Sequence, residues 1–185
     1  MHKALRISAL FLSFLAAAAL VGARAAQAAS AKDIDREASA ALDALYAKAP
    51  GARALGEKAK AVIVFPSVYK AALLLGGQGG NGAMFQDGRI VGHYNIGGVV
   101  AGLEAGAQAY SYALFFMSDG ALERLNTAKG FEIGLDPNIV VVNAGAGANF
   151  STTTAHRDVY GYVYGTSGLM GGVSLQGLKI TRLAK

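Results

Sequence analysis

Few residues of this chain could carry covalent or metal chemistry. The 185 residues contain no cysteine and three histidines. A hydrolase would need His93 or His156 as a general base beside a serine. Neither stands in a catalytic motif, and Gly165-Thr166-Ser167-Gly168 departs from the nucleophile elbow at Leu169. Without a His-x-His or His-x-x-x-His pair, the sequence predicts no enzyme, no metal site and no cofactor, and a hydrolase is the least favoured reading.

A glycine pattern at Gly77, Gly79 and Gly82 has the spacing of a dinucleotide-binding loop. Such a loop must lead into a helix whose N-terminus meets the pyrophosphate. The residues that follow instead predict a β-hairpin, because Asp87-Gly88 separates two apolar runs. We therefore expect a flexible glycine loop between strands and no nucleotide site.

Basic side chains indicate a binding role. They cluster around a predicted junction between a helix and a strand, with apolar residues between them: Arg53, Lys58, Lys60 and Lys70. A basic surface with exposed apolar groups suits anionic phospholipid, since each Lys or Arg near a membrane surface adds ~1 kcal/mol to binding. We expect these residues to contact lipid phosphates.

Three tyrosines, Tyr160, Tyr162 and Tyr164, alternate with Val and Gly and therefore share one face of a predicted strand. Each combines an apolar ring with a polar tip, which suits an interface or a lipid-lined groove. The same face would equally suit the cover of a hydrophobic core. Both interpretations stay open on the sequence alone.

The N-terminus has the pattern of a secretory signal peptide over residues 1–28. Lys3 and Arg6 precede an uncharged apolar run, Ile7–Val21, and Ala26-Gln27-Ala28 supplies a small-x-small cleavage site. Removal of this segment lowers the formal net charge from +5 to +2, which argues against nucleic-acid binding. We expect an exported protein, periplasmic or associated with the cell envelope, or secreted.

Residues 29–185 have the size of a single domain. Apolar residues make up 53% of the whole chain and charged residues 16%, which excludes an intrinsically disordered protein. The 25 glycines and three prolines favour tight turns and closely approaching strands. The composition therefore indicates β structure.

Residues 99–116 form the longest apolar stretch after the signal. Gly98, Gly102 and Gly106 have the spacing of packed membrane helices. The alternation of small apolar residues with Glu104 and Gln108 favours a strand, because an uncompensated Glu costs ~2.5 kcal/mol or more at a bilayer centre.

Periodicity predicts an N-terminal helical region followed mostly by strands. Spacings of three and four predict one helix from Ser30 to Pro50 and a short basic helix over 52–60, and Ser118 predicts the cap of an inserted helix over 120–129. The predicted strands cover 62–65, ended by Pro66, 70–75, 83–85, 89–96, 99–116, 131–135, 139–144, 148–153, 159–165 and 173–182. The fold class is therefore α+β: a strongly curved antiparallel sheet or closed β-barrel-like core, with N-terminal helices and one inserted helix.

Several ordered motifs resemble the SYLF domain family, also called the Ysc84 actin-binding-like domain. They are the run 59–71, which contains Phe65-Pro66-Ser67-Val68-Tyr69-Lys70, the glycine loop 76–82, Gly102-Leu103-Glu104-Ala105-Gly106, and the run 168–177. The resemblance covers approximately residues 30–183 and implies a non-enzymatic module that binds phospholipids through its basic N-terminal region. Lys70 carries over from the matching Pro-Ser-Val-x-Lys motif. Actin bundling, known for some eukaryotic members, is not expected of an exported chain.

These observations predict a non-catalytic exported protein that binds anionic phospholipid peripherally. Arg53, Lys58, Lys60 and Lys70 are expected to contact phosphates, with Tyr160, Tyr162 and Tyr164 as an apolar interface. The alternative is a structural or protein-interaction module of the envelope in which the tyrosines are core and lipid binding is incidental.

Overall fold

The computed structural model describes residues 30–127, 131–133, 139–143 and 157–184. The predicted signal peptide and the predicted strand 148–153 lie outside these residues, as does His156. Within the described part, three helices and a mostly antiparallel sheet confirm the α+β fold class. None of the described helices combines the length and the apolar character needed to cross a bilayer.

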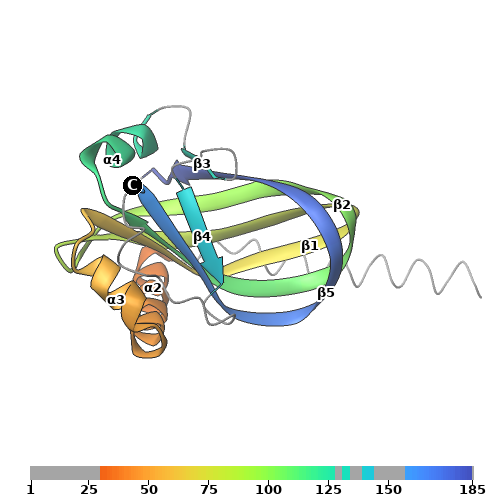
Figure 1. The fold of residues 1–185 in the computed structure, drawn as a ribbon, viewed down its shortest axis with the longest axis horizontal. Coiled ribbons are helices and arrows are strands. Elements are labelled where there is room, and N and C mark those ends of the chain that lie inside the picture. Colours follow the sequence, from red (N-terminus) through yellow and green to blue (C-terminus); the bar gives the residue numbers. More distant parts are fainter. Residues whose placement is uncertain (1–29, 128–130, 134–138, 144–156, 185) are drawn as a thin grey trace, which may run out of the picture. The chain divides into compact units, whose positions relative to one another are not determined.

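Three long strands dominate the domain (Figure 1). The helices are α2 (Ala31–Lys48), α3 (Pro50–Gly56) and α4 (Asp119–Leu125), and the strands are β1 (Ala61–Gln86), β2 (Arg89–Phe116), β3 (Phe131–Ile133), β4 (Ile139–Asn143) and β5 (Val159–Arg182). The strand order is β1-β2-β5-β3, and β4 pairs with β5 as the one parallel neighbour described. The hairpin predicted at Asp87-Gly88 joins β1 to β2, with both residues at positive φ.

Each long strand bends near its middle, and the three bends lie side by side. Leu74 of β1, Gly106 of β2 and Gly168 of β5 all have positive φ. The pairing brings these positions together, since Leu73 pairs with Ala105 and Ala107 pairs with Leu169. Figure 1 shows β1, β2 and β5 turning at the same end of the sheet. The bends divide the sheet into two arms that face each other.

The two arms approach closely along β1. A Cβ atom on Gly82 would overlap the carbonyl oxygen of Val64, and one on Gly80 would overlap that of Ser67. Glycine is required at this seam because only a residue without a side chain lets the two backbones come so near. The sheet is nevertheless open among the described residues: β1 and β3 end the strand order and do not pair with each other. Of the two predicted forms, the curved sheet is therefore observed and the closed barrel is not.

The domain has two apolar cores. The first lies between the arms and contains residues from both, including Phe65 and Phe116 from one arm and Ile96 and Ile180 from the other. The second lies between helices α2 and α3 and the sheet residues that face them, where Ile34, Ala38 and Leu45 meet Phe115 of one arm and Ala83 of the other. These α2 residues are four and seven positions apart, which places them on one side of the helix.

Three expectations about the elements need correction. Pro66 does not end β1, because a register shift between Phe65 and Val68 takes the proline out of the regular ladder. The glycine loop 76–82 is part of β1, and the predicted strands 159–165 and 173–182 are continuous in β5. Several glycines that the sequence analysis predicts to separate strands thus lie within them, where they permit bends and close approaches.

The inserted helix α4 is shorter than predicted but begins where expected. The side chain of Ser118 accepts a hydrogen bond from the backbone N–H of Ala121 at 3.2 Å. Asp158, just before β5, accepts hydrogen bonds from Ser118 and Arg124 at 2.9 and 2.8 Å. The Arg124 and Ser118 donors lower the pKa of Asp158 and join α4 to the start of β5.

Candidate functional site

Three of the four predicted basic residues are exposed at the junction between α3 and β1. Arg53 lies on α3 with its guanidinium carbon 5.1 Å from the centre of the Tyr46 ring. Lys58 is exposed in the turn that follows, and Lys60 lies 3.5 Å from a carboxylate oxygen of Asp119, with both side chains more than half exposed. An ion pair so exposed contributes little to stability, so the Lys60 ammonium remains accessible.

Lys70 does not belong to this surface, which corrects the prediction made for it. Its side chain is 3% exposed, and Nζ lies 2.7 Å from Oε1 of Glu104. The alternation along β1 turns Lys70 inward between the arms, while its neighbour Tyr69 points outward and is 65% exposed. The ammonium group is thus held by a buried carboxylate and cannot reach a lipid phosphate at the surface.

The three tyrosines of β5 belong to the second core. Tyr160 and Tyr162 are buried, and the Tyr162 ring packs edge-on against Phe115 with 5.7 Å between ring centres. The hydroxyl of Tyr164 donates a hydrogen bond to the carbonyl oxygen of Ala41 in α2 at 3.1 Å. Burial raises the pKa of Tyr162 and of Tyr164. Of the two interpretations left open by the sequence, the structure supports the one in which the tyrosines cover a hydrophobic core. The prediction that they form an apolar interface for lipid is wrong.

A second polar contact lies beside the Lys70–Glu104 pair. The hydroxyl of Tyr110 donates a hydrogen bond to Oε1 of Gln78 at 2.6 Å, and both side chains are buried. Lys70 and Gln78 come from β1, whereas Glu104 and Tyr110 come from β2. Near the bend, the inner face of the sheet therefore carries two buried polar contacts.

Alkaline pH should destabilise the protein through Tyr110. Burial raises the pKa of Tyr110 from 10.0 to about 12. The unfolded chain releases this proton first as the pH passes 10, so the stabilising contribution is complete below pH 10 and is lost as the pH rises towards 12. In urea unfolding, the free energy should fall less steeply between pH 10 and 12 in Tyr110→Phe than in the wild type, by up to about 1.4 kcal/mol per pH unit. From pH 7 to 9 the difference between the two proteins should stay constant, and equal slopes above pH 10 would contradict the prediction.

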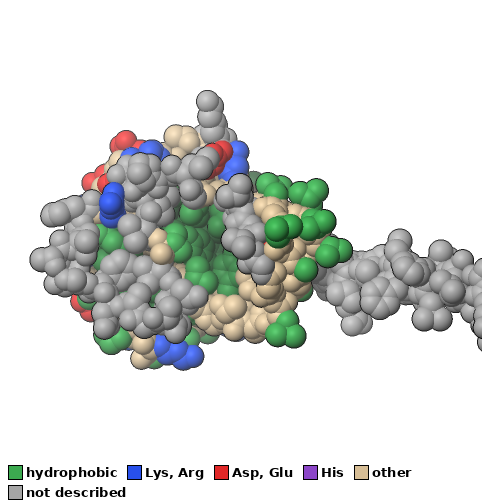
Figure 2. Space-filling view, turned by 45° about the vertical axis from the view of Figure 1, so that its right-hand side comes forward, with side chains coloured by type: hydrophobic (Ala, Val, Ile, Leu, Met, Phe, Trp, Pro, Cys, Tyr) green, Lys and Arg blue, Asp and Glu red, His purple; other side chains and the backbone are tan. Residues whose placement is uncertain are grey.

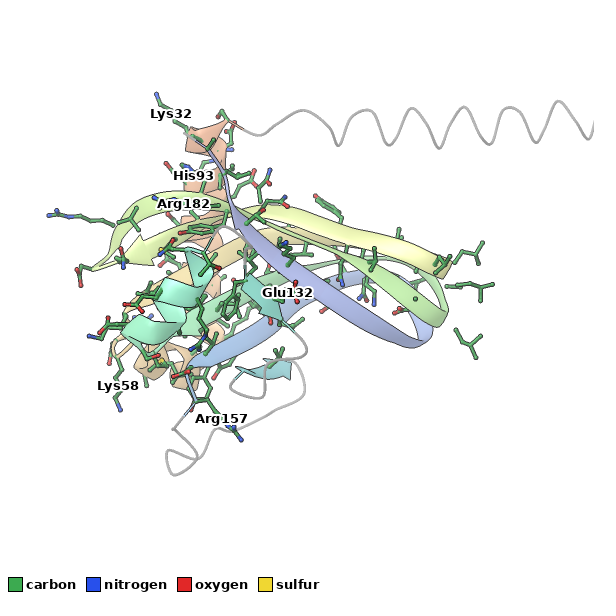
Figure 3. All side chains as sticks on the ribbon, turned by 90° about the horizontal axis from the view of Figure 1, so that it is seen from above. Lys32, Lys58, His93, Glu132, Arg157 and Arg182 are labelled. Atoms are coloured by element: carbon green, nitrogen blue, oxygen red, sulfur yellow. The ribbon has the colours of Figure 1, made fainter. Side chains whose placement is uncertain are left out.

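His93 has a structural partner. Its Nε2 lies 2.8 Å from Oδ1 of Asp35 in α2, a contact that ties the helix to β2. In Figure 3, His93 and Arg182 lie near the same end of the sheet. Among the described residues, no group of three or more His, Asp or Glu side chains is arranged to hold a metal ion.

One feature of the surface was not predicted: an apolar end of the domain, made by six large side chains at and beside the bends. They are 60–89% exposed: Leu73, Leu74, Leu75, Val99, Leu103 and Leu169. The alternation in 99–116 predicted a strand with one small apolar face, and β2 confirms the strand. The same alternation could have indicated an apolar surface. It does not tell, however, whether the apolar or the polar face of the strand turns outward.

Comparison with known proteins gives one family. Residues 97–184 match the family model described as Ysc84, Las17-binding protein actin regulator. The matched region contains the motifs at 102–106 and 168–177 and leaves out the runs at 59–71 and 76–82. No curated protein matches the chain.

Proposed function

Because residues 97–184 of this chain belong to the Ysc84 (SYLF) family, we propose that the protein is a non-catalytic phospholipid-binding protein that binds membranes peripherally. The resemblance of its motifs to the SYLF domain is the reason to choose lipid over other ligands. The signal-peptide pattern at residues 1–28 supports a location outside the cytoplasm, in the periplasm or cell envelope, or secretion. Its family description refers to Las17 and actin, and an exported chain would not meet the actin cytoskeleton.

The observation that carries the proposal is the exposed basic junction. Arg53, Lys58 and Lys60 fall within eight residues and all are exposed. Lys58 projects from the domain in Figure 3. Lipid phosphates attract such cations over about one Debye length, ~8–10 Å at physiological salt. This junction is our candidate contact with anionic headgroups.

Charge reversal at this junction should weaken binding to anionic vesicles. We expect Lys58→Glu with Lys60→Glu to lower the partition coefficient at least about tenfold, because each lost cation removes ~1 kcal/mol and each new anion is repelled. The measurement is co-sedimentation of the exported form, produced from the full-length gene, with vesicles of phosphatidylcholine and phosphatidylglycerol at low salt. Mass spectrometry of the intact protein checks cleavage after Ala28.

Lys32→Glu is the matched control. Lys32 is also exposed, but it lies at the start of α2, and Figure 3 places it at the opposite end of the helical layer from Lys58. It should change binding much less than reversal at Lys58 and Lys60. An equal loss in the control would show attraction by net charge alone, and no binding of the wild type to any vesicle would refute phospholipid binding.

A further inference from the structure

The apolar end is a continuous surface, although its residues come from three strands. Leu73, Leu74 and Leu75 lie on β1, Val99 and Leu103 on β2, and Leu169 on β5. Strand pairing makes them neighbours, since Gly77 pairs with Val99 and Ala107 with Leu169. Figure 2 shows hydrophobic side chains gathered on this side of the domain. Exposed apolar patches of this kind mark interaction sites.

The sheet near the bends has the reverse of the usual polarity. The buried side chains that turn inward here include four polar ones beside the apolar Val100: Lys70, Gln78, Glu104 and Tyr110. The outward-facing residues Leu73, Leu103 and Leu169 are 76%, 78% and 89% exposed. A sheet in water normally places its apolar face on the core and its polar face outward. Apolar side chains outside and polar ones inside are typical of strands whose outer face contacts lipid.

The exposed charged residues of the long strands also lie away from the bends. In β1, β2 and β5, the exposed charged residues Arg89, Lys179 and Arg182 all lie at the end away from the bends. The two charged residues near the bends, Lys70 and Glu104, are buried against each other. The described residues of the apolar end therefore present no charge to their surroundings.

The composition of this surface favours lipid over protein as the partner. Protein interfaces concentrate their binding energy in Trp, Tyr and Arg, with Leu and Val under-represented. Here the exposed large residues are Leu and Val, with small Ala and Gly between them. Tyr69 stands about 13 Å from Leu73 along β1, at ~3.3 Å per residue, which suits a ring at the headgroup level. Aliphatic side chains with a tyrosine at the margin match a bilayer surface.

We infer that the apolar end inserts into a phospholipid bilayer, with Leu73–Leu75, Leu103 and Leu169 among the lipid tails and the helices on the aqueous side. The inference rests on the proposed lipid binding and adds a second contact to it. Residues 61–73 of β1 separate the basic junction from the bend, a path of roughly 40 Å. This path is several Debye lengths, so insertion should not depend on anionic headgroups or on low salt.

The first test is binding to vesicles of phosphatidylcholine alone at 0.5 M salt. The exported wild-type protein should bind, and Leu103→Ser with Leu169→Ser should lower the partition coefficient at least about tenfold for each leucine. Val91→Ser is the control, because Val91 is 40% exposed and lies on β2 away from the bends. Thermal unfolding of all variants checks that the fold is retained.

The second test locates the inserted residues directly. The chain has no cysteine, so Leu103→Cys and Arg89→Cys each provide a single site for a fluorophore that responds to polarity. The label at 103 should shift to the blue on binding and be quenched by spin labels on the lipid tails. The label at 89, the first residue of β2 and away from the bend, should do neither.

The outcomes separate this inference from the proposed function. Binding that requires anionic lipid and low salt, and that survives the leucine changes, would overturn insertion and leave phospholipid binding in place. Absence of binding to every vesicle would overturn both. Concentration-dependent dimers without lipid, abolished by Leu103→Ser, would overturn insertion in favour of contact between copies of the chain. Insertion would be supported if spin labels on the lipid tails quench the fluorophore at position 103 and if the variant with Leu103→Ser and Leu169→Ser loses binding.

Discussion

Replacing Glu104 with Gln should lower the free energy of unfolding by about 3–5 kcal/mol, the usual cost of leaving one partner of a buried ion pair uncompensated. The Lys70 side chain is 3% exposed, and its Nζ lies 2.7 Å from Oε1 of Glu104. After the substitution, the buried Lys70 side chain would have no carboxylate beside it. Urea unfolding at pH 7 measures the effect.

The double variant Lys70→Met with Glu104→Leu provides the control. It removes both charges, and replacing a buried pair with apolar residues of similar volume is often neutral or stabilising. We expect it to recover most of the stability that Glu104→Gln loses. A double variant as unstable as the single one would show that the pair itself, and not the unpaired charge, determines stability.

Replacing Gly82 with Ala should cost about 3 kcal/mol, at the upper end of the range for overpacking. The new Cβ would overlap the backbone oxygen of Val64, and a backbone atom cannot move aside as the end of a flexible side chain can. Relief would require the two arms of β1 to separate. Thermal and urea unfolding would both register the loss.

Gly120→Ala is the matched change at a position with space. Gly120 lies in the first turn of α4, and nothing stands within 4 Å of an added Cβ. Alanine there should be neutral or stabilising by a few tenths of a kcal/mol up to ~1 kcal/mol. If Gly82→Ala were equally harmless, the arms would not be in contact at this seam.

The strands could be predicted from local pattern, but the path of the sheet could not. The alternation around Glu104 correctly predicted a strand over 99–116, and Asp87-Gly88 predicted the hairpin, although 89–96 and 99–116 form one strand, β2. The bends depend on positive φ at Leu74, Gly106 and Gly168, which lie in three different strands and become meaningful only once these strands pair. Leucine at such a φ has no sequence signature, since the conformation is rare for a bulky residue.

The candidate site shows the same limit. Arg53, Lys58 and Lys60 are exposed as expected, because they lie beside a turn between a helix and a strand. Lys70 stands in a well-matched motif, yet its burial follows from the fold that brings Glu104 to it. The tyrosines of β5 could be placed on one face of a strand, but only the packing of α2 on that face shows that it is core.

The pairing of β5 has a consequence for the timing of folding. This final strand pairs with β2 along both arms, from Phe116↔Val159 to Tyr94↔Arg182. The partners in the second of these pairs are far apart in the chain, and contacts of such long range form slowly. Until β5 is synthesised, β2 lacks one of its two neighbours, so the sheet cannot be completed. Both arms therefore depend on a strand that is synthesised after the rest of the described sheet, and neither arm is complete before that strand has paired.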